Sequence, residues 1–114
     1  MNKLQIFKNT DFGEIRTIEE NGKVLFCGSD VAKALGYSNV SDSLIKHCKN
    51  DGVAFCEVID KLGRTQQAKF INEGNLYRLI THSKLPAAEQ FEAWIFDEVL
   101  PTIRKTGGYV ANEE

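Results

Sequence analysis

The longest apolar pattern in the chain lies in residues 91–109 and predicts a helix. At 100° per residue, four apolar side chains fall on one arc: Phe91, Ile95, Val99 and Ile103. Trp94 widens this arc on one side, and Phe96 and Leu100 widen it on the other. An arc this wide indicates a helix covered on more than one side, either as the spine of the core or as half of a dimer contact. We favour the spine.

Four residues refine this predicted helix. Glu98 falls inside the apolar arc, and an unpaired buried carboxylate is costly, so we expect it to form a buried ion pair with Arg78. Pro101 has no N–H for the carbonyl four residues earlier, which predicts a kink or break near Leu100. The pair Gly107-Gly108 should end the helix, because glycine adopts the left-handed cap conformation at little cost.

Alternating apolar residues predict two β-hairpins. Strand-like runs at 14–19 and 23–26 flank Asn21-Gly22, and Asn-Gly is a strong signal for a two-residue turn. Runs at 53–59 and 66–71 flank a loop at 60–65 and form the second predicted hairpin, with Lys61 and Arg64 at its tip. Residues 4–7 are a plausible first strand.

Three shorter helices are predicted from caps and apolar stripes. Ser29 is the expected N-cap of a helix that ends at Gly36. Ser38, Asn39 or Ser41 should cap a second helix; Leu44, Ile45 and Cys48 would lie on its apolar side, and Asp42, Ser43, Lys46, His47 and Lys49 on its polar side. Asn72 or Glu73 opens a third helix, whose inward residues are Leu76, Leu79 and Ile80, and Pro86 should occupy the first turn of the spine.

The resulting order is hairpin, two short helices, hairpin, two longer helices. This order predicts an α+β fold in which two antiparallel β-hairpins pack with about four helices and the long C-terminal helix is the spine. A chain of 114 residues is long enough for one domain with a real core; we place that domain at residues 1–109, with a tail or linker at 110–114.

Composition narrows the classes of function. The chain has 14 Lys+Arg and 16 Asp+Glu, a net charge of −2, which argues against strong non-specific DNA binding but leaves room for a local basic face. Cys27, Cys48 and Cys56 are odd in number and widely spaced, so we expect free thiols, no disulfide and no metal. No apolar run approaches a membrane span, and we expect a cytoplasmic protein without a cofactor. His47, Cys48 and His82 form no evident catalytic arrangement, so an enzyme is not expected.

Several motifs together resemble the Bro-N domain, the N-terminal module of baculovirus BRO proteins and of phage and prophage antirepressors. The similar segments are 30–37, 71–79 and, most specifically, 91–109, where Trp94, Pro101 and Gly107-Gly108 stand in the family's order. The resemblance implies a viral or prophage regulatory module that binds double-stranded DNA, usually followed by a separate C-terminal domain. Family members are often more basic between residues 37 and 49, where this chain carries Asp42 and several serines.

The two short helices around Gly36 are either a helix-turn-helix-like pair or simply amphipathic helices with one solvated side. In the first case, lysines and arginines would hold phosphates while residues 39–43 contact bases. The candidate DNA-binding residues are Lys33, Asn39, Ser41, Ser43, Lys46, Lys49, Lys61, Arg64 and Lys69.

The acidic balance and the wide apolar arc favour an alternative. In that case the domain is a protein-interaction module that binds a phage repressor or forms a homodimer without contacting DNA. A continuous basic face in the folded protein would favour DNA, whereas a mixed surface with exposed apolar residues would favour a protein partner.

Overall fold

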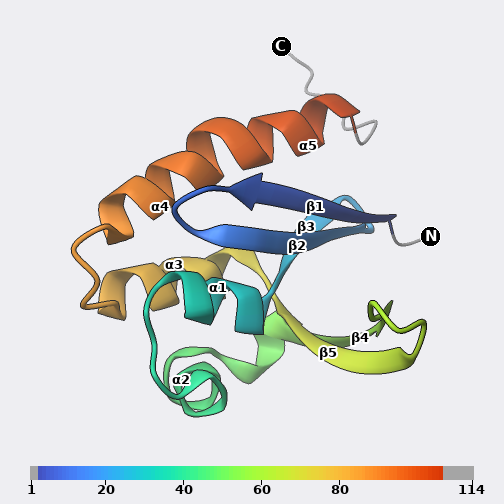
Figure 1. Cartoon of the computed structure of the whole chain (residues 1–114), viewed down its shortest axis with the longest axis horizontal. Coiled ribbons are helices and arrows are strands. Elements are labelled where there is room, and N and C mark those ends of the chain that lie inside the picture. The colour runs from blue at the N-terminus through green and yellow to red at the C-terminus, as the bar shows by residue number, and fades with distance from the viewer. Residues whose placement is uncertain (1–2, 107–114) are drawn as a thin grey trace.

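The computed structural model describes residues 3–106 and contains one five-stranded antiparallel sheet (Figure 1). Its strands are β1 (Lys3–Asn9), β2 (Gly13–Glu20), β3 (Lys23–Cys27), β4 (Val53–Ile59) and β5 (Thr65–Ile71). They are arranged in the order β1-β2-β3-β5-β4, which leaves β1 and β4 as the two edges.

The helices are α1 (Gly28–Ala34), α2 (Val40–His47), α3 (Glu73–His82), α4 (Ala88–Trp94), the π-helical turn η2 (Ile95–Val99) and α5 (Leu100–Thr106). A short 3-10 turn, η1 (Asn50–Gly52), precedes β4. Because α4, η2 and α5 run as one long helix (Figure 1), the described residues hold four helical units around the sheet. The predicted α+β class and long C-terminal helix are confirmed. The predicted end of the helix at Gly107-Gly108 and the domain boundary at residue 109 lie outside the described residues.

Both predicted hairpins are present. At the first bend, Asn21 and Gly22 have φ of 53° and 78°, the positive values that a two-residue turn of this type requires. The hairpins are not separate units, since β3 pairs with β5 through Phe26–Ile71 and Cys27–Phe70. The sequence analysis missed a further hairpin, β1–β2, whose turn is held by the Asn9 side chain accepting from the backbone N–H of Asp11 at 2.7 Å.

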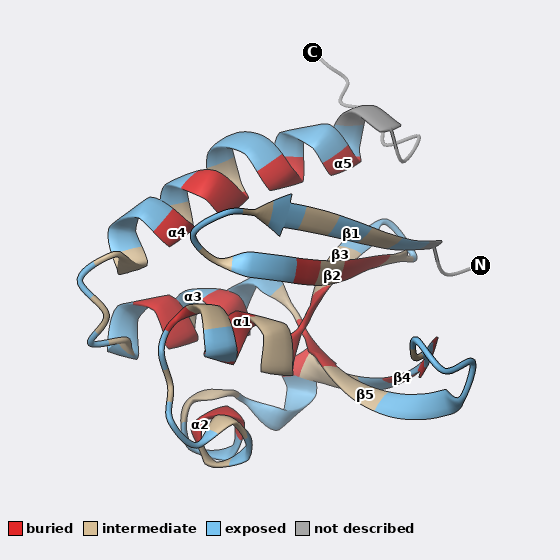
Figure 2. Ribbon diagram, in the orientation of Figure 1, coloured by how far each residue is buried: buried red, intermediate tan, exposed pale blue. Residues whose placement is uncertain are grey.

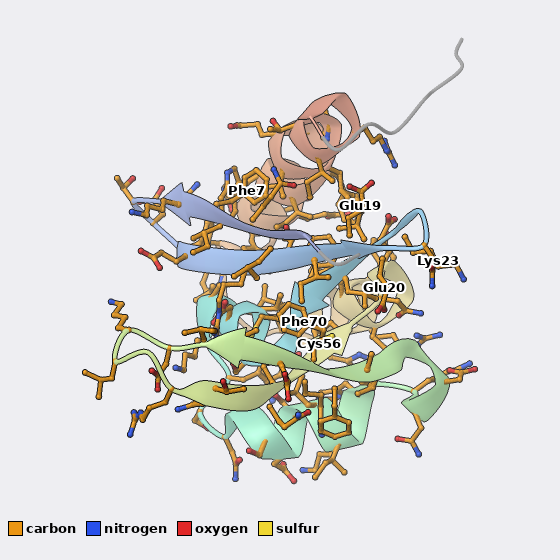
Figure 3. All side chains as sticks on the ribbon, turned by 90° about the vertical axis from the view of Figure 1, so that its right-hand side faces the viewer. Phe7, Glu19, Glu20, Lys23, Cys56 and Phe70 are labelled. Carbon is orange, nitrogen blue, oxygen red and sulfur yellow. The ribbon has the colours of Figure 1, made fainter. Side chains whose placement is uncertain are left out.

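The sheet has an apolar cluster on each face. On one face, Ile15, Phe26 and Ile71 form the main core together with apolar side chains of α3, α4, η2 and α5 (Figure 2). The second cluster contains Ile18, Cys27, Cys56, Val58 and Phe70. Figure 3 shows Cys56 and Phe70 between the β1–β3 layer and the β4–β5 hairpin, so the second cluster fixes the hairpins against one another.

The spine helix buries the arc that the sequence predicts. Phe91, Ile95, Val99 and Ile103 are almost fully buried, and Trp94 is only 9% exposed. The Phe12 ring packs edge-on against Phe91 at 5.2 Å between centroids. The helix begins at Ala88, so Pro86 lies just before it and not in its first turn.

The predicted buried pair between Glu98 and Arg78 is wrong. In η2 the backbone N–H of Leu100 donates to the carbonyl of Ile95, five residues back, so this turn holds one residue more than an α-helical turn. Val99 stays in the core, as the regular pattern predicts, whereas Glu98 lies outside the buried arc and is exposed. Arg78 instead donates from Nη1 to Oδ1 of Asn75 at 2.8 Å.

The irregularity expected from Pro101 is this π turn, which lies directly before it. Proline cannot donate to the preceding turn, and a widened turn accommodates that missing hydrogen bond without ending the helix. The helix accordingly continues through α5 instead of breaking at Leu100.

Candidate nucleic-acid interface

Helices α1 and α2 are joined by a turn that is firmly attached to the rest of the fold. Gly36 has φ of 81° and ends α1, as predicted. The hydroxyl of Tyr37 donates to the carbonyl of Leu79 in α3 at 2.7 Å. Asn39 caps α2 by accepting from the backbone N–H of Asp42 at 3.0 Å. The turn between the two helices is thus anchored to α3, and the start of α2 is fixed by its cap.

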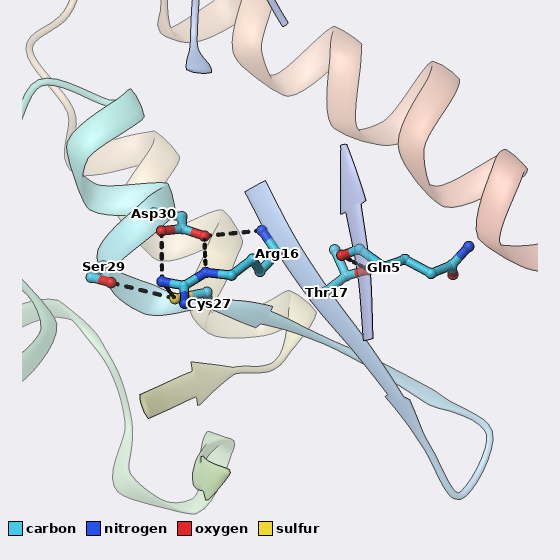
Figure 4. A network of polar contacts seen from close by, with 6 residues as sticks. All are labelled: Gln5, Arg16, Thr17, Cys27, Ser29 and Asp30. Carbon is cyan, nitrogen blue, oxygen red and sulfur yellow. Dashed lines mark hydrogen bonds and ion pairs between the residues drawn. The ribbon is translucent and has the colours of Figure 1, made fainter. Parts of the chain in front are cut away.

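A polar network ties α1 to the sheet (Figure 4). Asp30 accepts three hydrogen bonds from Arg16 of β2: from the backbone N–H at 3.0 Å, from Nε at 2.9 Å and from Nη2 at 3.1 Å. The hydrogen bond with Asp30 raises the pKa of the Arg16 guanidinium above its already high ordinary value.

The start of α1 differs from the prediction. The helix begins at Gly28, and Ser29 lies inside it, with its Oγ 3.3 Å from Sγ of Cys27, instead of serving as the N-cap. Because β3 ends at Cys27 and α1 begins at Gly28, Cys27 occupies the N-cap position, and its side chain makes no capping hydrogen bond.

Helix α2 approaches the start of α1 closely at one point. Leu44 is buried against Gly28, where an added Cβ would lie only 3.0 Å from Cδ1 of Leu44 and 3.2 Å from the carbonyl oxygen of Lys69. Glycine at position 28 therefore allows both Leu44 of α2 and the backbone of β5 to lie close to the start of α1.

The predicted faces of α2 need two corrections. Ser43, a candidate base-contacting residue, is buried, and its hydroxyl donates to the carbonyl of Val40 at 2.7 Å. Ile45, expected on the inward side, is 71% exposed. A serine can be buried at this position because it satisfies its hydroxyl within its own helix. The outward face of α2 is consequently formed by Ser41, Ile45 and Lys46.

The segment after α2 is held by Asn75, a fully buried residue that the sequence analysis did not single out. Its Oδ1 accepts from the backbone N–H of Lys49 at 2.8 Å, and its Nδ2 donates to the Lys49 carbonyl at 2.9 Å. Nη1 of Arg78 donates to the same Oδ1, the third hydrogen bond of the Asn75 side chain. An Asn adjoining the inward stripe of Leu76 and Leu79 is the signal that could have indicated this role.

The β4–β5 hairpin carries the remaining cations. Oδ1 of Asp60 accepts from the backbone N–H of Arg64 and Oδ2 accepts from its Nε, both at 2.9 Å. The first of these hydrogen bonds is the main reason that the pKa of Asp60 is lowered. Lys61 is exposed at the tip, and Nζ of Lys69 lies 5.7 Å from the centre of the Phe55 ring.

Most of the candidate cations gather on one part of the molecule. Helix α2 and the β4–β5 hairpin lie on the side away from α4 and α5 (Figures 1 and 3). They and the loop after α2 supply five of the six candidates: Lys46, Lys49, Lys61, Arg64 and Lys69. Lys33 lies on the neighbouring α1.

This surface is mixed in character. Lys46 pairs with Asp42 at 3.2 Å and Arg64 pairs with Asp60 at 2.9 Å. Exposed ion pairs are weak, so both cations remain accessible to a stronger anion. Exposed apolar side chains, Ile45 and Phe55, stand among these charges.

A pair of histidines beside α2 was not anticipated. The rings of His47 and His82 are stacked with centroids 4.5 Å apart, and Tyr37 lies 5.7 Å from His47 on its other side. They line a groove of about 730 Å³ that also includes Lys46 and Lys84. Burial lowers the pKa of His47, and the neighbouring His82 and Lys46 lower it further. Residues 35 positions apart cannot be paired from local pattern alone.

We predict that His82→Gln raises the pKa of His47 partway towards its ordinary value of about 6.5. The substitution removes one repelling cation, whereas burial, the largest cause, stays. The pKa is measured by NMR titration of the imidazole carbons, with Lys84→Gln as a control that leaves it unchanged. Since folding favours neutral His47, its contribution to stability is present above pH 6.5 and is lost as the pH falls through the lowered pKa. An unchanged pKa in His82→Gln would contradict the stacked arrangement.

The remaining chemistry of the described residues is sparse. Cys27, Cys48 and Cys56 are free thiols, and burial raises the pKa of Cys48 and Cys56. Within residues 3–104, no three His, Cys, Asp or Glu side chains gather in a metal-binding group. None of the helices in that part of the chain is long and apolar enough to cross a membrane.

The structure is thus a small α+β domain in which two short helices, α1 and α2, pack with a five-stranded antiparallel sheet and a long C-terminal helix. Residues 14–101 match the family model of Bro-N, the N-terminal domain of the BRO family. The chain therefore belongs to the Bro-N family, as its motifs predict.

Relatives occur in bacteria and in viruses. The chain is 51% identical over 92 residues to an uncharacterized protein of Haemophilus influenzae, covering 81% of this chain and 45% of that protein. It is 34% identical to Bro-N domain-containing protein 289L of Invertebrate iridescent virus 6, over 78% of this chain and 25% of the relative. It is 28% identical to Bro-N domain-containing protein L2 of Acanthamoeba polyphaga mimivirus, over 95% and 49% respectively. The chain thus spans half or less of these relatives, and no solved structure matches it.

Proposed function

We propose that this domain is a regulatory module of the antirepressor type, from a virus or prophage, that contacts duplex DNA through α2 and the β4–β5 hairpin. The observation that supports this most is the position of the candidate cations. Five of the six come from α2, the hairpin and the loop after α2, on the side away from the acidic spine helix. Cations on a mixed surface can still contact phosphates at low salt, even when the net charge of the chain is −2.

In this arrangement the cations hold phosphates and α2 faces the bases. Lys49, Lys61 and Arg64 supply phosphate contacts at the end of α2 and at the hairpin tip, and Lys33 and Lys69 add to them. Ser41 can hydrogen-bond to base edges, Lys46 can hold a phosphate beside them, and the exposed Ile45 suits the methyl group of thymine. Asn39 keeps its side chain at the cap of α2 and fixes the orientation of the helix.

The ion pairs on this surface set the strength of binding. To contact a phosphate, Lys46 must give up its ion pair with Asp42, and Arg64 must give up its ion pair with Asp60. The Lys46–Asp42 pair and the Arg64 guanidinium are exposed to solvent, so each exchange costs little. We therefore expect weak to moderate binding that is best seen at low salt.

The proposal is tested by titrating a fluorescently labelled duplex with the protein at several salt concentrations. Lys46→Ala and Arg64→Ala should each reduce the slope of log K against log[salt] by about one unit and weaken all sequences alike. Substitution of Ser41 or Ile45 should instead change the preference between sequences. Lys8→Ala, which removes an exposed cation from β1, is the matched control and should leave both slope and preference unchanged. Equal effects of Lys8→Ala and Lys46→Ala would contradict the assigned surface.

The exposed edge strands favour a second candidate function, protein association. Most large exposed apolar side chains lie on β1, on β4 or at the turn after β4: Leu4, Ile6, Phe55, Ile59 and Leu62. An apolar edge strand with unpaired backbone groups can pair with another chain. A homodimer or a complex with a phage repressor, seen by sedimentation velocity in the absence of any duplex binding, would favour this candidate over DNA.

A further inference from the structure

A second groove lies between α3 and the first half of the spine helix, and it shares no residue with the candidate nucleic-acid interface. It has a volume of about 460 Å³ and is lined by Glu73, Gly74, Tyr77, Glu92 and Phe96. Tyr77 is 50% exposed, although aromatic residues on helices are usually packed. Its ring lies 6.4 Å from that of Phe96 at an angle of 75°, so the two rings form adjoining walls of the groove.

The groove is strongly acidic. Within the part of the chain that the structure describes, neither Glu73 nor Glu92 has an ion-pair partner, and the Tyr77 hydroxyl has no hydrogen-bond partner. The part of the spine helix that forms one wall, α4 and η2, contains Glu89, Glu92, Asp97 and Glu98 but no Lys or Arg. Arg104 of α5 and Lys23 lie along the adjoining hollow on the other side of Glu73. The two carboxylates, which lie beside two aromatic rings, thus create a negative potential in the groove that attracts cations.

We propose that this groove is a docking site for an arginine side chain presented by a basic segment of another protein. A guanidinium group is planar and stacks on aromatic rings, and it also donates charge-assisted hydrogen bonds to carboxylates. Gly74 has no side chain to close the groove. A lysine would supply the charge but not the planar stacking surface, so arginine fits the combined lining better.

Other occupants fit the lining less well. A purely apolar side chain would desolvate Glu73 and Glu92 without pairing them, which is costly. Nucleic acid would bring phosphates towards uncompensated carboxylates. The chemistry of the groove therefore selects a cationic protein partner, and this second surface would let one domain contact protein and DNA with different sides.

The test uses the full chain and a tri-arginine peptide, followed by ¹H–¹⁵N NMR. We expect saturable shifts at the amides of Gly74, Tyr77 and Phe96, and none with the tri-citrulline peptide, which keeps the shape of arginine without its charge. Tyr77→Ala should lower the affinity for the tri-arginine peptide about tenfold, because it removes a cation–π contact. Glu92→Gln should weaken it several-fold, whereas Glu89→Gln, an exposed carboxylate outside the groove on the same helix, should change it little.

Each alternative result overturns the assignment. Equal binding of the citrulline peptide would show that charge is not recognised. Equal losses in Glu89→Gln and Glu92→Gln would show diffuse attraction to an acidic helix only. Groove shifts that appear on raising the protein concentration without peptide would identify a second copy as the occupant. Because Tyr77 lies outside the candidate nucleic-acid interface, Tyr77→Ala should leave the duplex titration unchanged, so the two proposals fail independently.

Discussion

Replacing Asn75 with alanine is expected to lower the free energy of unfolding by about 3 kcal/mol, the largest effect that we predict for a polar residue. Asn75 is fully buried and hydrogen-bonds to both backbone groups of Lys49. Its removal leaves an N–H and a carbonyl without partners, and each costs about 1–3 kcal/mol when it is kept from water. The Arg78 guanidinium loses a partner at the same time.

Urea or guanidinium unfolding followed by Trp94 fluorescence measures this effect. Asn72→Ala is the matched control, since Asn72 caps α3 through one hydrogen bond to the backbone N–H of Asn75. Loss of such a cap costs about 1 kcal/mol. If Asn75→Ala were no more destabilising than Asn72→Ala, the segment after α2 would not depend on this clamp.

The second large effect concerns the contact between β2 and α1. Asp30→Ala is expected to destabilise the domain by about 2–3 kcal/mol, because it removes three hydrogen bonds and leaves the Arg16 guanidinium partly buried without its carboxylate. The side chains of Arg16 and Asp30 are 31% and 13% exposed, so solvent screens this pair only in part.

An exposed pair on the same sheet provides the comparison. Lys8 and Glu14 approach to 3.8 Å, with side chains 75% and 51% exposed. Glu14→Ala should therefore change the free energy of unfolding by less than about 0.5 kcal/mol in the same denaturant experiment. Similar small losses in Glu14→Ala and Asp30→Ala would mean that the network in Figure 4 does not anchor α1.

The elements that could be predicted from the sequence are those with strong local signals. Asn21-Gly22 requires positive φ, and the structure has it there. The cap at Asn39 and the stop at Gly36 likewise act within a few residues of their own position. The joining of the two hairpins into one sheet depends on Phe26 meeting Ile71, 45 positions away, and no local pattern contains that pairing.

The misplaced residues lie in helices, where local geometry and tertiary packing decide which side chains face the core. A single π turn accompanies the exposure of Glu98, while Val99 remains in the core. On α2, which has only eight residues, a narrow contact buries Ser43 and exposes Ile45, against the order of their hydrophobicity. Tertiary packing decides such short helices more than their intrinsic pattern does.

The candidate site could be predicted in outline only. The charged residues of α2 and the second hairpin could be expected at the surface from the local sequence alone, without knowing which residues lie next to them in the fold. The buried Asn75 clamp and the stacked His47–His82 pair join residues from separate helices, and each became visible only once α2 and α3 were placed together.

If a few cations on α2 and the β4–β5 hairpin bind duplex DNA, as proposed, the affinity must depend steeply on salt. Six candidate positions exist, and with about half in contact at once, log K should fall against log[salt] with a slope near −3, since each neutralised phosphate contributes about −0.9. The titration should begin at about 50 mM salt, where weak electrostatic binding is strongest. A slope near −3 that becomes shallower in Lys46→Ala and Arg64→Ala is the predicted result. A flat salt dependence, or no duplex binding even at that salt concentration, would contradict the claim.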